Sequence, residues 1–268
     1  MAEIDLGRVL GKDGAPKYNL LDNSWWERRS EIVNQRGYNT YTGNQYTIDR
    51  WRTYSTDAKI NVNDGNLTIA AGALMQYLDI DPYKTYTAAI KQADGTIKIA
   101  TGTFSSGFGN NAIGIRCSVV DDYCRFLIES TVGAKGLLWA ALYEGSYAAD
   151  TLPDYVPKGY ASELRECQRY YIGVSSANAH FSLQGYAYSA TEARLTIPVG
   201  TQMRIAPTVT VGTIGNVNLF PGNIAPTEIT GAALSLNAVT VALKASGLTQ
   251  NVPLVAKINT TLSLSADL

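Results

Sequence analysis

The stretch Tyr83-Lys-Thr-Tyr-Thr-Ala-Ala-Ile90, then Ala93-Asp94-Gly95, then Thr96-Ile-Lys-Ile-Ala100, carries the clearest structural signal in this chain. Its first segment is rich in β-branched and aromatic residues, and its last segment alternates apolar and polar side chains. The Asp-Gly dipeptide between them favours a tight turn, because glycine readily adopts the positive φ that hairpin turns require. The stretch therefore predicts two paired antiparallel strands.

The same pattern recurs on both sides of this hairpin, at intervals of about 8–12 residues. Asn63-Asp64-Gly65-Asn66 predicts another hairpin turn, and Asp121-Asp122 separates two further β-prone segments. The segment from Tyr46 to Tyr54 is dense in aromatic and β-branched residues and indicates a strand. One short helix is expected within residues 161–171, where Ser162 can cap its first turn. The chain is therefore expected to be all-β, with little helix and a sandwich or barrel architecture.

The composition changes along the chain and indicates two modules. Residues 175–268 hold seven of the 45 charged side chains, and there Thr or Ser alternates with Val or Leu. We expect a lead-in at residues 1–18, a first β-sandwich at 19–160 that ends in a proline-bearing linker, and a second, sandwich-like module at 161–268. A sheet face of Thr and Ser with almost no lysine is poorly protected against pairing with other chains. The second module is therefore expected to bind sister subunits in a homo-oligomer.

Several classes of protein are disfavoured by the bulk numbers. The net charge is −1 and the pI is about 5.9, so no basic field is available to attract nucleic acid. No apolar run of membrane-spanning length occurs, and the N-terminus lacks the basic start and apolar stretch of a secretory signal. The three cysteines, Cys117, Cys124 and Cys167, have neither zinc spacing nor an even count, which favours free thiols.

No enzyme active site is recognisable in the sequence. His180 is the only histidine, and no Gly-x-Ser-x-Gly nucleophile elbow or phosphate-binding loop occurs. Pairs of carboxylates such as Asp121 and Asp122 are expected in solvated turns rather than in a catalytic cleft. We therefore expect no catalytic residue, no metal site and no cofactor. A glycosidase needs only two carboxylates, so a polysaccharide-cleaving activity stays open as an alternative.

The aromatic residues suggest binding. The chain has 17 Tyr and 4 Trp against 5 Phe, and the Tyr and Trp rings combine an apolar face with a polar group, as sugar stacking requires. The alternative for Trp51 and Trp139 is a role as core anchors, because each lies within a strand-like segment. The candidate glycan-binding residues are Trp25, Trp26, Trp51, Tyr54, Tyr123 and Trp139.

A family resemblance covers roughly residues 19 to 210. Asn19-Leu-Leu-Asp-Asn23, Val33-Asn-Gln-Arg-Gly37 and Tyr46-Thr-Ile-Asp-Arg-Trp51 resemble the opening of many bacteriophage tail and fibre proteins. The elements Cys167-Gln-Arg-Tyr-Tyr171 and Met203-Arg-Ile-Ala-Pro-Thr208 resemble the end of that domain and the module that follows it. The resemblance implies a jelly-roll module similar to carbohydrate-binding domains, a β-structured tip and a trimer.

The same resemblance implies a place on the particle. The N-terminal segment is similar to the virion-attachment ends of fibres, with Ile4, Leu6 and Val9 as the expected contacts to other virion proteins. The chain would then be made in the host cytoplasm and work at the virion surface. Its expected function is that of a short tail or head fibre, a receptor-binding protein that contacts host-surface glycans. The alternatives are a purely structural head or tail decoration protein, and a depolymerase, which the absence of long internal repeats disfavours.

Overall fold

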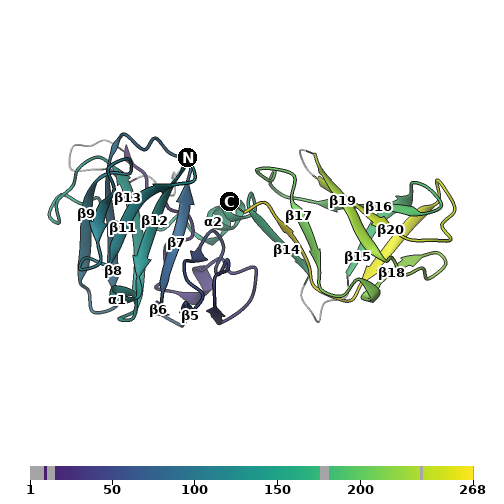
Figure 1. Ribbon diagram of the computed structural model, residues 1–268, viewed down its shortest axis with the longest axis horizontal. Helices are drawn as coiled ribbons and strands as arrows, with labels where there is room; N and C mark the ends of the chain where they lie inside the picture. Colours follow the sequence, from purple (N-terminus) through teal and green to yellow (C-terminus); the bar gives the residue numbers. More distant parts are fainter. Residues whose placement is uncertain (1–8, 11–15, 176–180, 236–237, 268) are drawn as a thin grey trace, which may run out of the picture. The chain divides into compact units, whose positions relative to one another are not determined.

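The computed structural model describes residues 9–10, 16–175, 181–235 and 238–267, and it confirms the all-β class (Figure 1). The chain divides into two compact units, Met1–Leu164 and Arg165–Leu268. This division falls inside helix α2 (Tyr160–Cys167). It lies a few residues after the boundary expected between residues 160 and 161. Each unit is built from antiparallel sheets that enclose an apolar core of their own.

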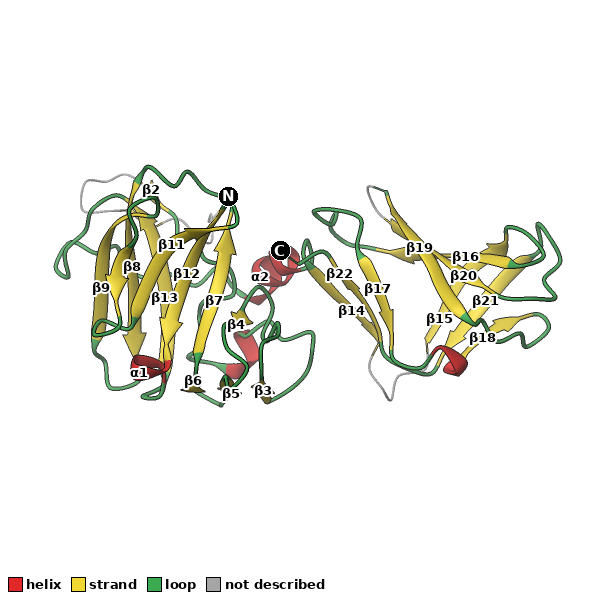
Figure 2. Cartoon of the chain, in the orientation of Figure 1, coloured by secondary structure: helices red, strands yellow, loops and turns green. Residues whose placement is uncertain are grey.

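The first unit is a sandwich of two antiparallel sheets (Figure 2). The five-stranded sheet has the order β10 (Phe108–Asn110), β11 (Ile115–Val120), β12 (Tyr123–Glu129), β7 (Ala73–Leu78), β4 (Arg52–Thr53). The six-stranded sheet has the order β3 (Thr40–Thr42), β5 (Lys59–Val62), β6 (Leu67–Ala71), β13 (Leu137–Glu144), β8 (Thr85–Gln92), β9 (Ile97–Thr103). Two short helical turns, η1 (Arg29–Glu31) and α1 (Ser130–Gly133), connect strands at the edges of the sandwich.

Alternation along the strands decides which side chains enter the core of the first unit. In β12, Cys124, Phe126 and Ile128 belong to the core between the sheets, so Arg125 and Leu127 point to the outside. In β13, Ala140 and Leu142 belong to the core in the same way, whereas the neighbouring residues face outward. Each sheet therefore has an outer face on which functional side chains can be placed.

The expected turns are confirmed, but one expected strand is wrong. Gly95 closes the β8–β9 turn with φ +85°, and Asp121 and Asp122 form the β11–β12 turn with φ +48° and +67°. Of the segment from Tyr46 to Tyr54, only Arg52–Thr53 is strand. Arg50 has φ +73°, which an extended strand cannot accommodate, and the residues around it belong to the polar network described below.

The second unit packs a three-stranded sheet and a six-stranded sheet around a separate core. The smaller sheet has the order β14 (Tyr171–Ser175), β22 (Leu262–Ser265), β17 (Thr208–Val211). The larger sheet has the order β18 (Val217–Phe220), β21 (Pro253–Ile258), β15 (Phe181–Ala187), β16 (Glu192–Pro198), β20 (Ala238–Lys244), β19 (Glu228–Leu234), and η2 (Ile214–Asn216) precedes β18. In β21 buried and exposed residues alternate without exception, as the sequence pattern of this module indicated.

The N-terminal segment is described only in part. Val9–Leu10 forms β1 and pairs with β2, Pro16–Lys17, while Ile4 and Leu6 lie outside the described residues, as does His180. All three cysteines are buried and none forms a disulfide, and burial raises the pKa of the Cys117 thiol well above its ordinary value. Within the described part of the chain, no helix is long and apolar enough to cross a membrane.

Candidate functional site

The first three segments of the family resemblance meet in one buried polar network. The Asn23 side chain donates hydrogen bonds to the carbonyl oxygens of Val33 (2.7 Å) and Asp49 (2.9 Å), and its Oδ1 accepts one from the Val33 N–H (2.9 Å). The carbonyl oxygen of Asn23 accepts a bond from the indole N–H of Trp26 and from that of Trp51, each at 3.0 Å. These motif residues therefore fix the segment around Asn23, where the chain enters the first unit, against the sandwich.

Two of the candidate glycan-binding residues belong to this network, and their assignment was wrong. Trp26 and Trp51 are both 0% exposed, and their rings meet edge to face with centroids 5.3 Å apart. Since a sugar can stack only on an accessible ring face, neither residue contacts a glycan. The alternative of a core anchor holds for Trp51, and it applies equally to Trp26. It also bears on Trp139, which is 7% exposed and belongs to a buried cluster with Ala89, Ala141 and Tyr143.

Trp25 points the opposite way from its neighbour Trp26. The segment that contains it runs antiparallel to β13, with the Trp26 N–H donating to Leu138 O (2.7 Å) and the Ala140 N–H to Ser24 O (2.9 Å). Adjacent residues of an extended segment face opposite sides. Trp26 therefore enters the core, while Trp25 reaches the outer face of the six-stranded sheet.

On this outer face one transverse row of side chains crosses four neighbouring segments. Trp25 lies opposite Trp139 of β13, Trp139 lies opposite Lys91 of β8, and Lys91 lies opposite Ile97 of β9. Residues directly opposite in antiparallel pairs have their Cβ atoms about 4.5–5.5 Å apart. The row thus forms a continuous floor, apolar at Trp25, Trp139 and Ile97 and cationic at Lys91.

The segment after β13 forms the wall above this floor. The Tyr155 ring stacks on the Trp139 ring, with centroids 5.0 Å apart and planes 6° from parallel. The Tyr155 hydroxyl lies 3.1 Å from the Ser24 hydroxyl, and burial raises the Tyr155 pKa far above its ordinary value. Tyr155 is therefore a fixed, neutral part of the wall, as Pro153 and Pro157 also restrict the backbone on either side.

The floor and the wall enclose a groove of about 500 Å³. Three charged side chains, Glu27, Lys91 and Asp154, line it together with the aromatic rings. None of the three has a side-chain hydrogen bond or an ion pair among the residues that the structure describes. Charged groups left open beside aromatic rings are suited to the hydroxyl groups and the apolar face of a sugar. The groove lining consists of Trp25, Glu27, Lys91, Ile97, Trp139, Ala149, Leu152, Pro153, Asp154, Tyr155 and Pro157.

The structure separates the candidates into three places. Trp25 and Trp139 meet at the groove, where Trp25 is half-buried and Trp139, under the Tyr155 ring, is only 7% exposed. Trp26 and Trp51 are in the core, Tyr123 lies in β12, and Tyr54 directly follows β4. The sequence reasoning missed Tyr155 and Lys91. The prolines of residues 150–160 indicated a linker, although an aromatic residue between two prolines is also compatible with a rigid wall.

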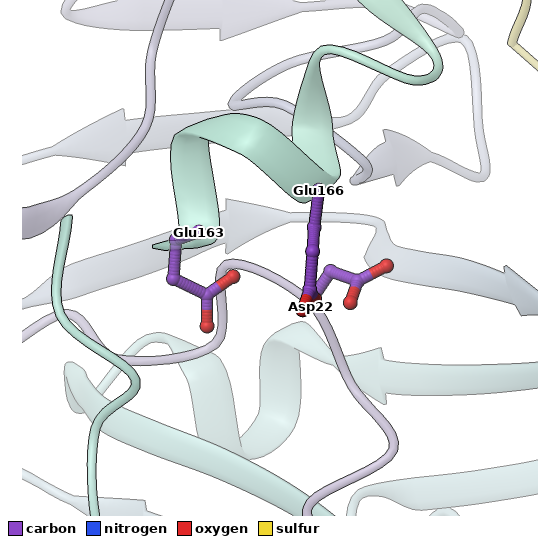
Figure 3. A group of neighbouring side chains, drawn as sticks. All are labelled: Asp22, Glu163 and Glu166. Carbon is purple, nitrogen blue, oxygen red and sulfur yellow. The ribbon is translucent and has the colours of Figure 1, made fainter. Parts of the chain in front are cut away.

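A group of three carboxylates is formed by Asp22 and by two residues of helix α2 (Figure 3). Their oxygens, from Asp22, Glu163 and Glu166, lie within 4.8 Å of one another. Asp22 pairs with Arg50 (2.9 Å) and with Lys158 (3.3 Å), and Glu163 accepts the Asn23 N–H at 2.6 Å. These contacts give Asp22 and Glu163 a structural role in fixing the chain entry.

Comparison with protein-family models, with curated proteins and with solved structures returned no match. The fold and the groove alone define the class: an all-β protein of two sandwich units, with an aromatic groove on the outside of the first.

Proposed function

We propose that this chain is a non-enzymatic glycan-binding component of a phage particle, a short fibre or receptor-binding protein. The observation that carries the binding role is the meeting of Trp25, Trp139 and Tyr155 in one groove that three charged side chains also line. The virion assignment is supported by the sequence resemblance to tail and fibre proteins. The N-terminal segment would then attach to other virion proteins, and the groove would meet the host surface.

Trp25 is the residue through which the binding role is best tested. It is half-buried at the groove edge, and the Arg28 guanidinium lies 5.9 Å from its ring centroid. Stacking of a sugar on an aromatic ring is worth about 0.5–1.5 kcal/mol beyond the area buried. Trp25→Ala is therefore expected to weaken glycan binding about tenfold or more, measured on a glycan array and on intact host cells.

The matched control is Tyr83→Ala. Tyr83 is 79% exposed and precedes β8, at the opposite end of that strand from Lys91. This variant should bind as the wild type does. Equal binding by wild type and Trp25→Ala would contradict the groove assignment, and release of reducing sugar ends from the bound polysaccharide would instead favour the depolymerase alternative.

A homo-oligomer, with a trimer as the expected form, is part of the proposal. On the larger sheet of the second unit an uncharged row crosses five strands in register: Phe220, Val255, Gln184, Thr196 and Thr240. Val255, the second residue of this row, is 40% exposed. Val255→Asp should dissociate the oligomer, because it places a charge in an apolar contact.

Sedimentation velocity at micromolar concentration measures this effect. Val119→Asp is the control, since Val119 is 42% exposed in the first unit and should leave the oligomer intact. A wild-type monomer would overturn the oligomeric part of the proposal.

A further inference from the structure

The outer face of the five-stranded sheet has a composition unlike that of the groove. A row in register crosses four strands there, with Arg116 opposite Leu127, Leu127 opposite Met75 and Met75 opposite Arg52. Leu127 is 0% and Met75 is 3% exposed, although both point away from the main core. The two apolar residues at the centre of the row are therefore shielded from solvent on the outer face of the sheet. Arg116 and Arg52 lie at the two ends of the row.

Two residues further along β12, on the same outer face, lies a third arginine, Arg125, with tyrosines around it. Arg125 lies opposite Ser118 and Tyr77, and its Nη2 donates to the Ser118 hydroxyl at 3.1 Å. Its guanidinium lies 5.1 Å from the ring centroid of Tyr54, which is 48% exposed. The Tyr77 and Tyr123 rings meet edge to face at 6.4 Å. We call the surface formed by Tyr54, Tyr77, Tyr123, Arg52 and Arg125 the Arg–Tyr face.

The two arginines of this face, together with the neighbouring Arg116, are incompletely neutralised. Arg116 pairs with Glu129, but Arg52 and Arg125 have no carboxylate partner among the described residues. The Nε atoms of all three arginines lack a hydrogen-bond acceptor within the described part of the chain. These Nε atoms are buried, so an anion can reach Arg52 and Arg125 only through their Nη groups, beside the tyrosine rings.

We propose that the Arg–Tyr face is a second binding site, which takes an acidic, uronate-bearing polysaccharide. Carboxylates of the polymer pair with the Arg52 and Arg125 guanidinium groups, and its sugar rings pack on Tyr54 and on the Tyr77–Tyr123 pair. Guanidinium groups match carboxylates in geometry as well as in charge. This site does not depend on the groove, which lies on the other sheet.

The charge pattern favours a polysaccharide over nucleic acid. Asp121 and Asp122 form the exposed turn next to Tyr123, so the positive region is short and bounded by acidic groups. A polyphosphate backbone requires an extended run of cations, and the chain as a whole carries a net charge of −1. Spaced carboxylates on a sugar polymer need only the two arginines.

Binding of polygalacturonate and of its fully methyl-esterified form to the full-length protein tests the proposal. The two polymers share the same sugar chain, and only the first is charged. We expect the wild type to bind polygalacturonate at least tenfold more tightly than the ester, and more weakly as salt is raised. The double variant Arg52→Gln/Arg125→Gln should lose about tenfold in affinity for polygalacturonate.

Two single variants distinguish the Arg–Tyr face from the groove and from a general loss of positive charge. Arg194→Gln removes an arginine that also lies over a tyrosine ring, 3.4 Å from the Tyr188 centroid, but in the second unit, and it should bind polygalacturonate normally. Trp25→Ala should also bind it normally, so that failure of the groove and failure of this face remain distinguishable. Equal binding of both polymers, no binding of polygalacturonate, or unchanged binding by a folded double variant would overturn the proposal. A change of oligomeric state in the double variant with binding unchanged would assign the face to subunit contact instead.

Discussion

Replacing Trp26 by alanine is expected to destabilise the first unit by about 3–5 kcal/mol, the usual cost of deleting a large buried aromatic side chain. The Trp26 ring is fully buried against Trp51, and its N–H donates to Asn23 O at 3.0 Å. Alanine would leave a cavity and remove one of the two indole hydrogen bonds to the Asn23 carbonyl oxygen, so both losses act together. Urea unfolding followed by tryptophan fluorescence measures the effect, because all four tryptophans belong to residues 1–164 and report the first unit alone.

The neighbouring residue supplies the control for this experiment. Trp25→Ala removes the same side chain one position earlier, but from the groove, where Trp25 is only half-buried. It should cost clearly less stability than Trp26→Ala while weakening glycan binding. Similar losses of stability in both variants would contradict the opposite orientation of the two tryptophans.

Asn23→Ala is expected to have an effect of similar size, about 3–5 kcal/mol, for a different reason. The variant leaves the Asp49 carbonyl oxygen and the Val33 N–H without the Asn23 side chain as a partner, at about 1–3 kcal/mol for each group left unsatisfied. It also removes one of two hydrogen bonds to the Val33 carbonyl oxygen, which keeps the bond from the Asp49 N–H. Asn23 also has φ +49°, a conformation that asparagine tolerates better than alanine does. The loss should appear as a lower urea midpoint for the first unit.

Asn44→Ala is the matched substitution, because Asn44 is exposed in the loop between β3 and β4. It should change the free energy of unfolding by no more than about 0.5 kcal/mol. An Asn23→Ala midpoint equal to that of Asn44→Ala would show that the network of Asn23, Val33 and Asp49 does not hold the chain entry.

The network also gives a structural role to the segments on which the expected phage-fibre resemblance rests. Asn23, Val33, Asp49 and Trp51 come from three separate segments and meet through backbone hydrogen bonds. Asp49 is fully buried and pairs with Arg36 at 3.0 Å and with Gln35 at 2.7 Å. Such a constellation restricts residue types strongly, because each buried polar group needs its own partner. The recognisable motifs therefore describe the scaffold of the first unit.

The aromatic candidates show where sequence reasoning stopped. The rings of Trp25 and Trp26 face opposite sides because their segment is extended and pairs with β13. A Trp-Trp pair in a sequence predicts these orientations only if that pairing is already known. The sequence contains neither the partner strand nor the register. Trp139 and Lys91 are 48 positions apart, yet the register of β13 with β8 makes them neighbours. Composition could suggest sugar binding, but it could not choose the rings.

Strand periodicity, hairpin turns and the change of composition after residue 174 determined the all-β class and the presence of two modules, because local alternation and turn chemistry act over a few residues. Tertiary structure alone decided the rest. It buried Trp26 and Trp51, brought Trp25, Trp139 and Tyr155 into one groove, and placed Arg52 and Arg125 on a single face. These outcomes depend on which strands pair and in which register, and that choice is made by the packing of the whole core.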